Sequence, residues 1–202
     1  MAAFLDKRKV LSTLGQNGKV MLELGCGKQK RYPGSIAIDQ LDAEQVDIVC
    51  DLNEGLGFIP DNSVDIVYSH HFLEHLADQA AFFREIYRVL KPGGHKTGTV
   101  PHFSNPYYYS DYTHQTPFGL YSFCYLADQS PFRRKVLKYD AEVHFRINRI
   151  RLVFYSPFKV VNLFRKFYGI IFNASTWMQE LYEGSFSDIF PAYEIEFELE
   201  KL

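Results

Sequence analysis

Three features are scarce in this chain of 202 residues, and each scarcity excludes a class of protein. Cysteine occurs only three times, at positions 26, 50 and 124, which is unlike the dense cysteine framework of a small secreted domain. No uncharged stretch reaches the ~20 apolar residues that a membrane-spanning helix needs. The formal net charge is only -2, so the whole chain has no general attraction for nucleic acid. We expect a cytoplasmic protein without a nucleic-acid partner.

The remaining composition is that of an ordinary globular protein. Hydrophobic residues make up 47% of the chain and charged residues 23%, and the length suits one domain with a full core. We predict a single domain over 1–202, with a cofactor-binding half at 1–103. The second half, 104–202, would hold a binding loop, an extra helix and a final pair of strands. Residues 1–11 are typical of a short amphipathic helix rather than of a secretion signal.

The most informative segment is a glycine turn between two apolar runs. The first run ends at Glu23, the turn is Gly25-x-Gly27, and the second run closes at Asp39. The runs predict buried parallel strands, and the glycines let the backbone turn sharply and approach a ligand. At the end of the second strand, Asp39 is placed to accept hydrogen bonds from ribose hydroxyls. The segment therefore predicts a nucleotide-cofactor site.

The next segments continue the pattern. Residues 46–50 and 63–68 are short β-branched runs that end at Asp51 and at Ser69-His70. Polar groups thus recur at the carboxyl ends of successive strands, which is where open α/β sheets bind their ligands. Residues 77–90 predict a helix that stops at Lys-Pro-Gly-Gly, and residues 96–100 predict the next strand.

With these segments in view, the chain resembles the class I S-adenosylmethionine-dependent methyltransferases, in the branch of small single-domain enzymes with the type 11 pattern. The resemblance rests on five blocks: Glu-Leu-Gly-Cys-Gly at 23–27, Ile-Asp at 38–39, Cys-Asp-Leu at 50–52, and residues 61–75 and 85–94. It implies a Rossmann-like α/β fold, doubly wound, with a mostly parallel seven-stranded sheet and an antiparallel last strand. Gln29 departs from the pattern, since many members have a third glycine there.

The resemblance also implies residue roles, with S-adenosylmethionine as the cofactor. Glu23 would lie near the methionine end, the turn Gly25-Cys26-Gly27 beneath it, and Asp39 at the ribose. Asp51 and Leu52 would flank the adenine. Ser69, His70 and His71 would line the gap between donor and acceptor. For each of them the simpler alternative is a strand-end residue that only caps a turn.

The acceptor site is expected in the long loop at 101–119, which is rich in Pro, Tyr, Ser and Asn. Its aromatic and polar side chains suit a sugar ring or an aromatic acceptor, and the stretch is similar to one in methyltransferases of bacterial surface glycans. This favours O-methylation and a role in glycan modification.

A hydroxyl acceptor needs a base, for which His114, oriented by Asp111, is the first candidate, with His70 and His102 as others. The alternative is that His114 and Asp111 only hold the loop together. His102, Asp111 and His114 match no metal-binding spacing, so no metal is expected.

The second half adds a basic and an acidic segment. Residues 133–166 are rich in Arg and Lys and residues 180–202 are acidic, which indicates either steering of an anionic acceptor or two solvated faces that meet in the fold. Residues 143–154 predict a long edge strand, and residues 193–199 predict its antiparallel partner. The helix expected at 157–172 has a wide apolar face and a basic stripe. It suits core packing, a homodimer, or peripheral contact with a membrane that carries a lipid-linked acceptor.

Two other functions are compatible with the sequence. One is a catalytically idle S-adenosylmethionine-binding subunit of a larger assembly. The other is an NAD-dependent short-chain oxidoreductase, but Lys30 stands where G-x-G-x-x-G has its third glycine.

Overall fold

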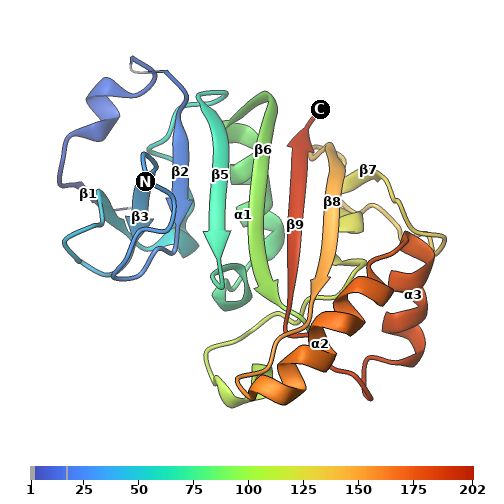
Figure 1. The fold of residues 1–202 in the computed structure, drawn as a ribbon. Helices are drawn as coiled ribbons and strands as arrows, with labels where there is room; N and C mark the ends of the chain where they lie inside the picture. Colours follow the sequence, from blue (N-terminus) through green and yellow to red (C-terminus); the bar gives the residue numbers. More distant parts are fainter. Residues whose placement is uncertain (1–2, 17) are drawn as a thin grey trace.

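In the computed structural model, residues 3–16 and 18–202 are described, and they build a single mixed sheet (Figure 1). The nine strands found there lie in the order β1-β4-β3-β2-β5-β6-β9-β8-β7. Their bounds are β1 Phe4–Asp6, β2 Met21–Leu24, β3 Ile36–Asp39, β4 Ile48–Cys50, β5 Val64–His70, β6 Leu90–Pro101, β7 Ala127–Gln129, β8 Phe145–Val153 and β9 Glu194–Lys201. The helices are α1 Gln79–Val89, α2 Lys159–Phe172 and α3 Thr176–Ser185.

The centre of the sheet is parallel, as the apolar runs predict. Strands β4, β3, β2, β5 and β6 pair in parallel, and β9 then runs antiparallel between β6 and β8. Leu22, Leu24 and Ile38 are fully buried, because strands in this part of the sheet have both faces covered. The parallel direction brings the carboxyl ends of β2 to β5 to one edge.

The structure differs from the predicted elements in three details. Two short strands extend the expected seven, with β1 antiparallel to β4 and β7 parallel to β8, so β8 is not the edge strand. The described part of 1–11 forms β1 and the start of a 3-10 turn, not an amphipathic helix; residues 1–2 lie outside the described residues. Strand β6 starts directly after α1 and includes the Lys-Pro-Gly-Gly segment that stops the helix, so it begins before the strand predicted at 96–100.

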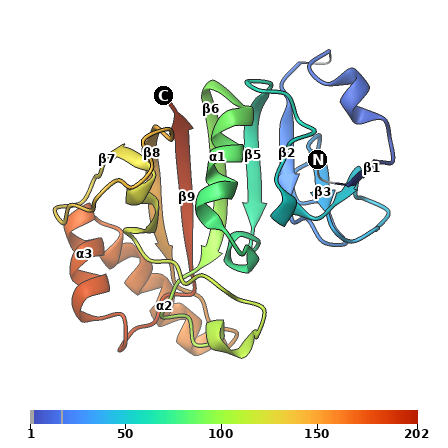
Figure 2. The same cartoon turned by 180° about the vertical axis from the view of Figure 1, so that it is seen from behind.

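The helices are few and unevenly placed. Helix α1 is capped at its N-terminus by Asp78, whose carboxylate accepts a hydrogen bond from the Ala81 backbone N–H at 2.9 Å. The helix covers one face of the sheet (Figure 2). Residues 25–35 and 40–47, which connect β2 to β3 and β3 to β4, contain no α-helix. These two connections therefore contribute no helix to the layers that cover the sheet in a doubly wound fold. The glycine turn is also not followed by a helix N-terminus.

The basic and acidic segments of the second half meet in the sheet. Strands β8 and β9 pair side by side, and Arg146 lies 2.5 Å from Glu200 while Arg149 and Arg151 both lie within 3.3 Å of Glu196. The two charge runs largely neutralise each other across these strands. The charge asymmetry of the sequence therefore reflects two faces that meet in the fold.

Candidate active site

A pocket of about 750 Å³ opens at the carboxyl edge of β2 to β5. This volume lies in the range of small-molecule and cofactor sites. One side is formed by residues that follow β2, β3 and β4: Gly25, Gly27, Asp39, Gln40, Leu41, Asp51, Leu52 and Asn53. The other side comes from the turn after β5 and from the long loop: His71, Phe72, His75, Leu76, Tyr112, Thr113 and Gln115.

The absence of a side chain serves a different physical purpose at each of the two glycines of the turn. Both have positive φ angles, +67° at Gly25 and +60° at Gly27. A Cβ on Gly25 would lie only 2.4 Å from Cδ2 of Phe72, whereas a Cβ on Gly27 would meet no atom within 4 Å. Gly25 thus permits close packing of β2 against Phe72, and Gly27 leaves open space on the pocket side.

Asp39 lies at the end of β3, holds the turn in place and faces the pocket. One carboxylate oxygen accepts a hydrogen bond from the Gly27 N–H at 2.7 Å, and the other accepts one from the Leu41 N–H at 2.9 Å. The side chain is buried but forms part of the pocket wall. A carboxylate has about four acceptor sites, so two remain for the hydroxyls of a ribose.

Asp51 and Leu52 follow β4 and also line the pocket. Asp51 caps a 3-10 turn, where one carboxylate oxygen accepts from the backbone N–H and the side-chain amide of Asn53. Leu52 is buried. An acidic group beside an apolar side chain fits an adenine ring with its exocyclic amine. A concave surface that offers two carboxylates and an open glycine turn is complementary to a nucleoside cofactor.

Comparisons with known proteins agree with this geometry. Residues 28–96 match the type 11 methyltransferase domain family. A segment of 36 residues is 56% identical to a probable S-adenosylmethionine-dependent methyltransferase of Mycolicibacterium smegmatis, covering 18% of this chain and 14% of that protein. Over these segments the chain is similar to S-adenosylmethionine-dependent methyltransferases.

Solved structures agree with the fold of this chain. An S-adenosylmethionine-dependent methyltransferase from Archaeoglobus fulgidus aligns with a TM-score of 0.55 at 16% identity, over 96% of this chain and 90% of that one. A putative methyltransferase from Bacillus halodurans gives 0.54 at 18% identity, over 96% and 99%. These likenesses concern the fold. The curated relative is much longer, since this chain spans only 14% of its length.

Four residues expected to contact S-adenosylmethionine lie outside the pocket lining. Glu23 is buried, and its carboxylate accepts hydrogen bonds from the N–H groups of Arg31 and Tyr32 and from the Ser35 hydroxyl, at 2.8 to 3.1 Å. It holds the loop after the glycine turn. Ser69 is buried and accepts a hydrogen bond from Lys96 at 2.5 Å. A direct role of either residue at the cofactor stays a prediction.

Cys26 and His70 are half-buried beside the site. Burial raises the pKa of the Cys26 thiol to about 12, so the thiol is neutral and unreactive at physiological pH. The His70 ring lies against that of His71, with centroids 4.5 Å apart, and burial lowers the pKa of His70. Neither side chain lines the pocket.

The predicted base, His114, lies behind the pocket wall. Its Nδ1 is 2.9 Å from the carbonyl oxygen of Tyr108, and its Nε2 is 3.6 Å from Asp111, too far for the orienting hydrogen bond expected. Asp111 instead accepts from the N–H and hydroxyl of Thr113, which lowers its pKa. His102 is fully buried and bonded to Ser104, so it is a core residue.

The acceptor side is lined by the turn after β5 and by residues of the long loop, but not by the first base candidate or the side chain expected to orient it. His71 has a φ of +49° and places Nε2 2.7 Å from a carboxylate oxygen of Glu194. The backbone carbonyl of Glu74 accepts hydrogen bonds from the N–H groups of Gln115 and Thr116, and so ties the long loop to the turn after β5. Only this tertiary contact makes Thr113 and His75 neighbours.

Glu74 is the most unusual group of the site. Its side chain is fully buried, and neither carboxylate oxygen has a hydrogen-bond partner among the described residues. Burial raises the pKa of Glu74 to about 7. A buried carboxyl group without a partner is costly in either protonation state, so its presence calls for an explanation.

Proposed function

We propose that this methyltransferase transfers the methyl group of S-adenosylmethionine to a hydroxyl of a small-molecule or glycan-like acceptor. The supporting observation is that one pocket joins the glycine turn and Asp39 on one side to His71, His75 and the long loop on the other. The cofactor supplies an electrophilic methyl group. The chain then has to hold the acceptor oxygen in line with that methyl and keep water out.

Exposed aromatic rings beside the pocket favour a glycan-like acceptor. Tyr112 lines the pocket and is 97% exposed, and Tyr107 and Tyr109 of the same loop are also exposed. Rings that present a face to solvent next to a polar cavity can pack against the apolar face of a sugar, and their hydroxyls can bond its oxygens. Gln115 and Thr113 add polar groups that would orient such an acceptor.

His71 is better placed than His114 to receive the acceptor proton. It lines the pocket, and the contact between its Nε2 and Glu194 at 2.7 Å fixes the orientation of the ring. This is the arrangement of an oriented general base. Replacing His71 with Gln should leave cofactor binding unchanged and strongly reduce turnover, whereas loss of cofactor binding would contradict this role.

The site is tested by isothermal titration with S-adenosylhomocysteine, with NAD as the control ligand. Wild-type protein should bind the first and not the second. Asp39→Ala removes two charge-assisted hydrogen bonds to the ribose and should weaken binding by about 100-fold or more. Asp42→Ala, an exposed acidic residue of the next loop, is the matched control and should bind as wild type.

Each alternative function gives a distinct outcome. Binding of NAD alone would favour the oxidoreductase. Tight binding of S-adenosylhomocysteine with no methyl transfer to a panel of sugars, phenols and amines would favour the idle subunit. Unchanged affinity in the Asp39→Ala variant would reject the proposed cofactor site.

The acceptor is further proposed to be lipid-linked, because α2 presents an apolar face at the surface. Phe158, Leu163, Phe164, Phe167 and Ile170 are all more than half exposed. None of the helices in the described part of the chain has the length and apolar character to cross a bilayer. A helix with this exposed face, three basic residues and no acidic residue matches an interfacial membrane helix.

A further inference from the structure

A cluster of metal-ligating side chains adjoins the acceptor side of the pocket. Glu74 and His75 come from the 3-10 turn Leu73–His75 after β5, and His114 comes from the long loop. One carboxylate oxygen and one nitrogen from each ring lie within 4.8 Å of one another. The burial of Glu74 without a partner is a second, independent sign that a cation belongs here.

The hydrogen bonds around the two rings leave a free nitrogen on each. Nδ1 of His114 faces the Tyr108 carbonyl, which can only accept, so Nδ1 carries the proton and Nε2 has a free lone pair. The Thr113 hydroxyl donates to Asp111 at 2.6 Å and can then accept from Nδ1 of His75 at 2.9 Å. Nε2 of His75 is therefore also free. Histidine ligands of metals are typically held in this way through their second nitrogen.

We propose that Glu74, His75 and His114 bind a divalent transition-metal ion of the zinc type. Two imidazoles and one carboxylate are a known ligand set for catalytic zinc, and they leave a further coordination position open. Ligand atoms around tetrahedral zinc lie roughly 3.4 Å apart, so the cluster must contract by about 1.4 Å at its widest. Side-chain rotation of His75, which is partly exposed, can supply that movement.

A protonated Glu74 does not remove the need for a partner. The neutral acid still has a hydroxyl donor and acceptor sites that would remain unpaired in a buried position. His71 Nδ1 lies 3.5 Å from the nearest carboxylate oxygen, but this contact does not qualify as a hydrogen bond. A cation would satisfy the charge and the lone pairs together.

The neighbouring cluster of His70, His71 and Glu194 contains none of the buried side-chain atoms that lack a hydrogen-bond partner in the described part of the chain. Nε2 of His71 already lies 2.7 Å from Glu194, and Glu194 is not among the buried side chains without a partner. The metal is therefore assigned to the Glu74 cluster alone.

The position of the cluster gives the ion a function that rests on the proposed methyl transfer. His75 and Thr113 line the same pocket as Gly25 and Asp39. A metal at this wall can coordinate an acceptor hydroxyl, lower its pKa and fix its orientation toward the methyl group. His71 would then take up the released proton.

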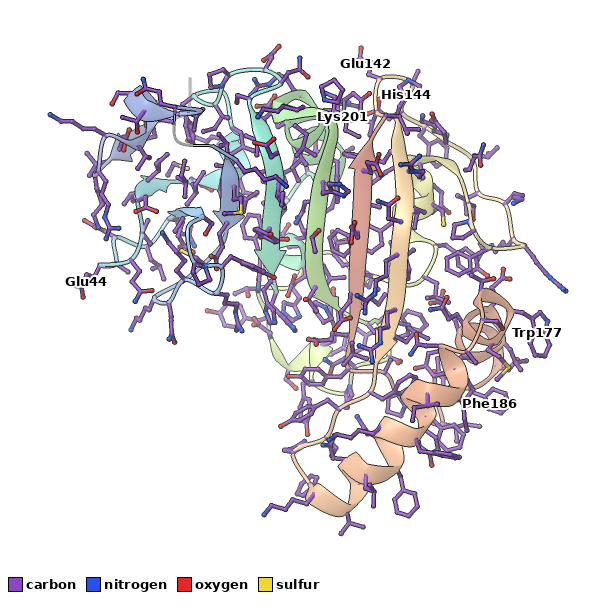
Figure 3. The ribbon with its side chains drawn as sticks, turned by 45° about the horizontal axis from the view of Figure 1, so that its top comes forward. Glu44, Glu142, His144, Trp177, Phe186 and Lys201 are labelled. Carbon is purple, nitrogen blue, oxygen red and sulfur yellow. The ribbon has the colours of Figure 1, made fainter. Side chains whose placement is uncertain are left out.

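The experiment is titration of metal-free protein with Zn²⁺, after removal of bound metal with a chelator, together with elemental analysis of the protein as purified. One equivalent of Zn²⁺ should bind. Glu74→Gln and His75→Gln should each weaken binding by at least 100-fold. His144→Gln is the matched control, because His144 lies at the opposite end of the sheet (Figure 3), and it should bind as wild type.

Two outcomes would overturn the site. One is the absence of saturable Zn²⁺ binding by the wild-type protein, and the other is wild-type affinity in both Glu74→Gln and His75→Gln. Circular dichroism of each variant shows whether it is folded, and His75→Gln changes a partly exposed side chain, so it tests the site without altering the core. No cofactor or acceptor is present in this titration. A failed metal site therefore leaves methyl transfer standing, and failed S-adenosylhomocysteine binding leaves the metal site standing.

Discussion

At the scale of single residues, the two glycines of the turn differ in role: Gly25 is needed for packing against Phe72, and Gly27 leaves space on the pocket side. Gly25→Ala would place a methyl group 2.4 Å from Phe72 and force a non-glycine residue to a φ of +67°. Gly27→Ala incurs only the second cost, about 1–2 kcal/mol. In urea unfolding we expect Gly25→Ala to lose clearly more stability than Gly27→Ala. Equal losses would show that the contact with Phe72 relaxes freely.

Lys96 is a second residue whose burial has a measurable consequence. The side chain is fully buried in β6, where desolvation lowers its pKa well below 10.5. Between the lowered folded pKa and 10.5 the unfolded chain binds more protons, so this residue makes stability rise with pH. We predict that Lys96→Met stabilises the protein by about 1 kcal/mol or more at pH 7 and that the gain shrinks toward pH 10.

The control for this effect is an exposed lysine. Lys166→Met, on the surface of α2, removes the same charge without relieving desolvation and should change the unfolding free energy little at either pH. Thermal or urea unfolding at pH 7 and pH 10 measures all three proteins. A gain for Lys96→Met that is the same at both pH values would reject the desolvation argument.

At the scale of elements, α1 depends on its N-cap residue, Asp78. The Asp78 carboxylate accepts from the Ala81 N–H, and loss of such a cap costs about 1 kcal/mol. Asp78→Ala should lower the urea midpoint accordingly, because α1 buries Phe82, Phe83 and Ile86 against the sheet. Asp188→Ala, at an exposed position outside the helices, should leave the midpoint unchanged. An unchanged midpoint for both variants would mean that tertiary packing alone sets the start of α1.

The same scale shows which parts of the fold the sequence could predict. The runs that became β2, β3 and β5 are apolar and bounded by turn residues, so their own pattern determines them. Strands β1 and β7 have three residues each and form by pairing with the free edges of β4 and β8. Helix α3 was missed, although Ser175 caps it through the N–H of Met178, because that segment carries only a weak amphipathic pattern.

The candidate site also contains residues that a local sequence pattern predicts and residues that it does not. The glycine turn and Asp39 lie within 15 residues of one another, and Asp39 itself accepts from Gly27, so a local pattern was sufficient. The pair of His75 and Thr113 is 38 residues apart in sequence. It depends on the backbone contacts between Glu74 and the long loop, which no local period predicts. The one feature of the sequence that points to Glu74 is its charge, since it follows apolar residues in the turn after β5.

At the scale of the whole molecule, the exposed face of α2 points to a surface on which the protein works. Ile170 is 73% exposed and Phe167 57% exposed, and the helix contains Lys159, Arg165 and Lys166 without an acidic residue. An exposed apolar face this large on a globular domain normally marks an interaction site. The basic residues favour an anionic lipid surface over a second copy of the same basic helix, whose like charges would repel.

Co-sedimentation with vesicles tests this surface. Wild-type protein should bind phosphatidylcholine vesicles that contain phosphatidylglycerol and bind pure phosphatidylcholine weakly. Each lysine near an anionic surface contributes about 1 kcal/mol, so Lys159→Gln with Lys166→Gln should weaken binding about 30-fold. Phe167→Glu with Ile170→Glu should abolish binding while leaving the unfolding free energy nearly unchanged, because both side chains are already exposed. Sedimentation of the wild type as a dimer that this last variant converts to monomers, with no vesicle binding, would instead identify α2 as a dimer interface.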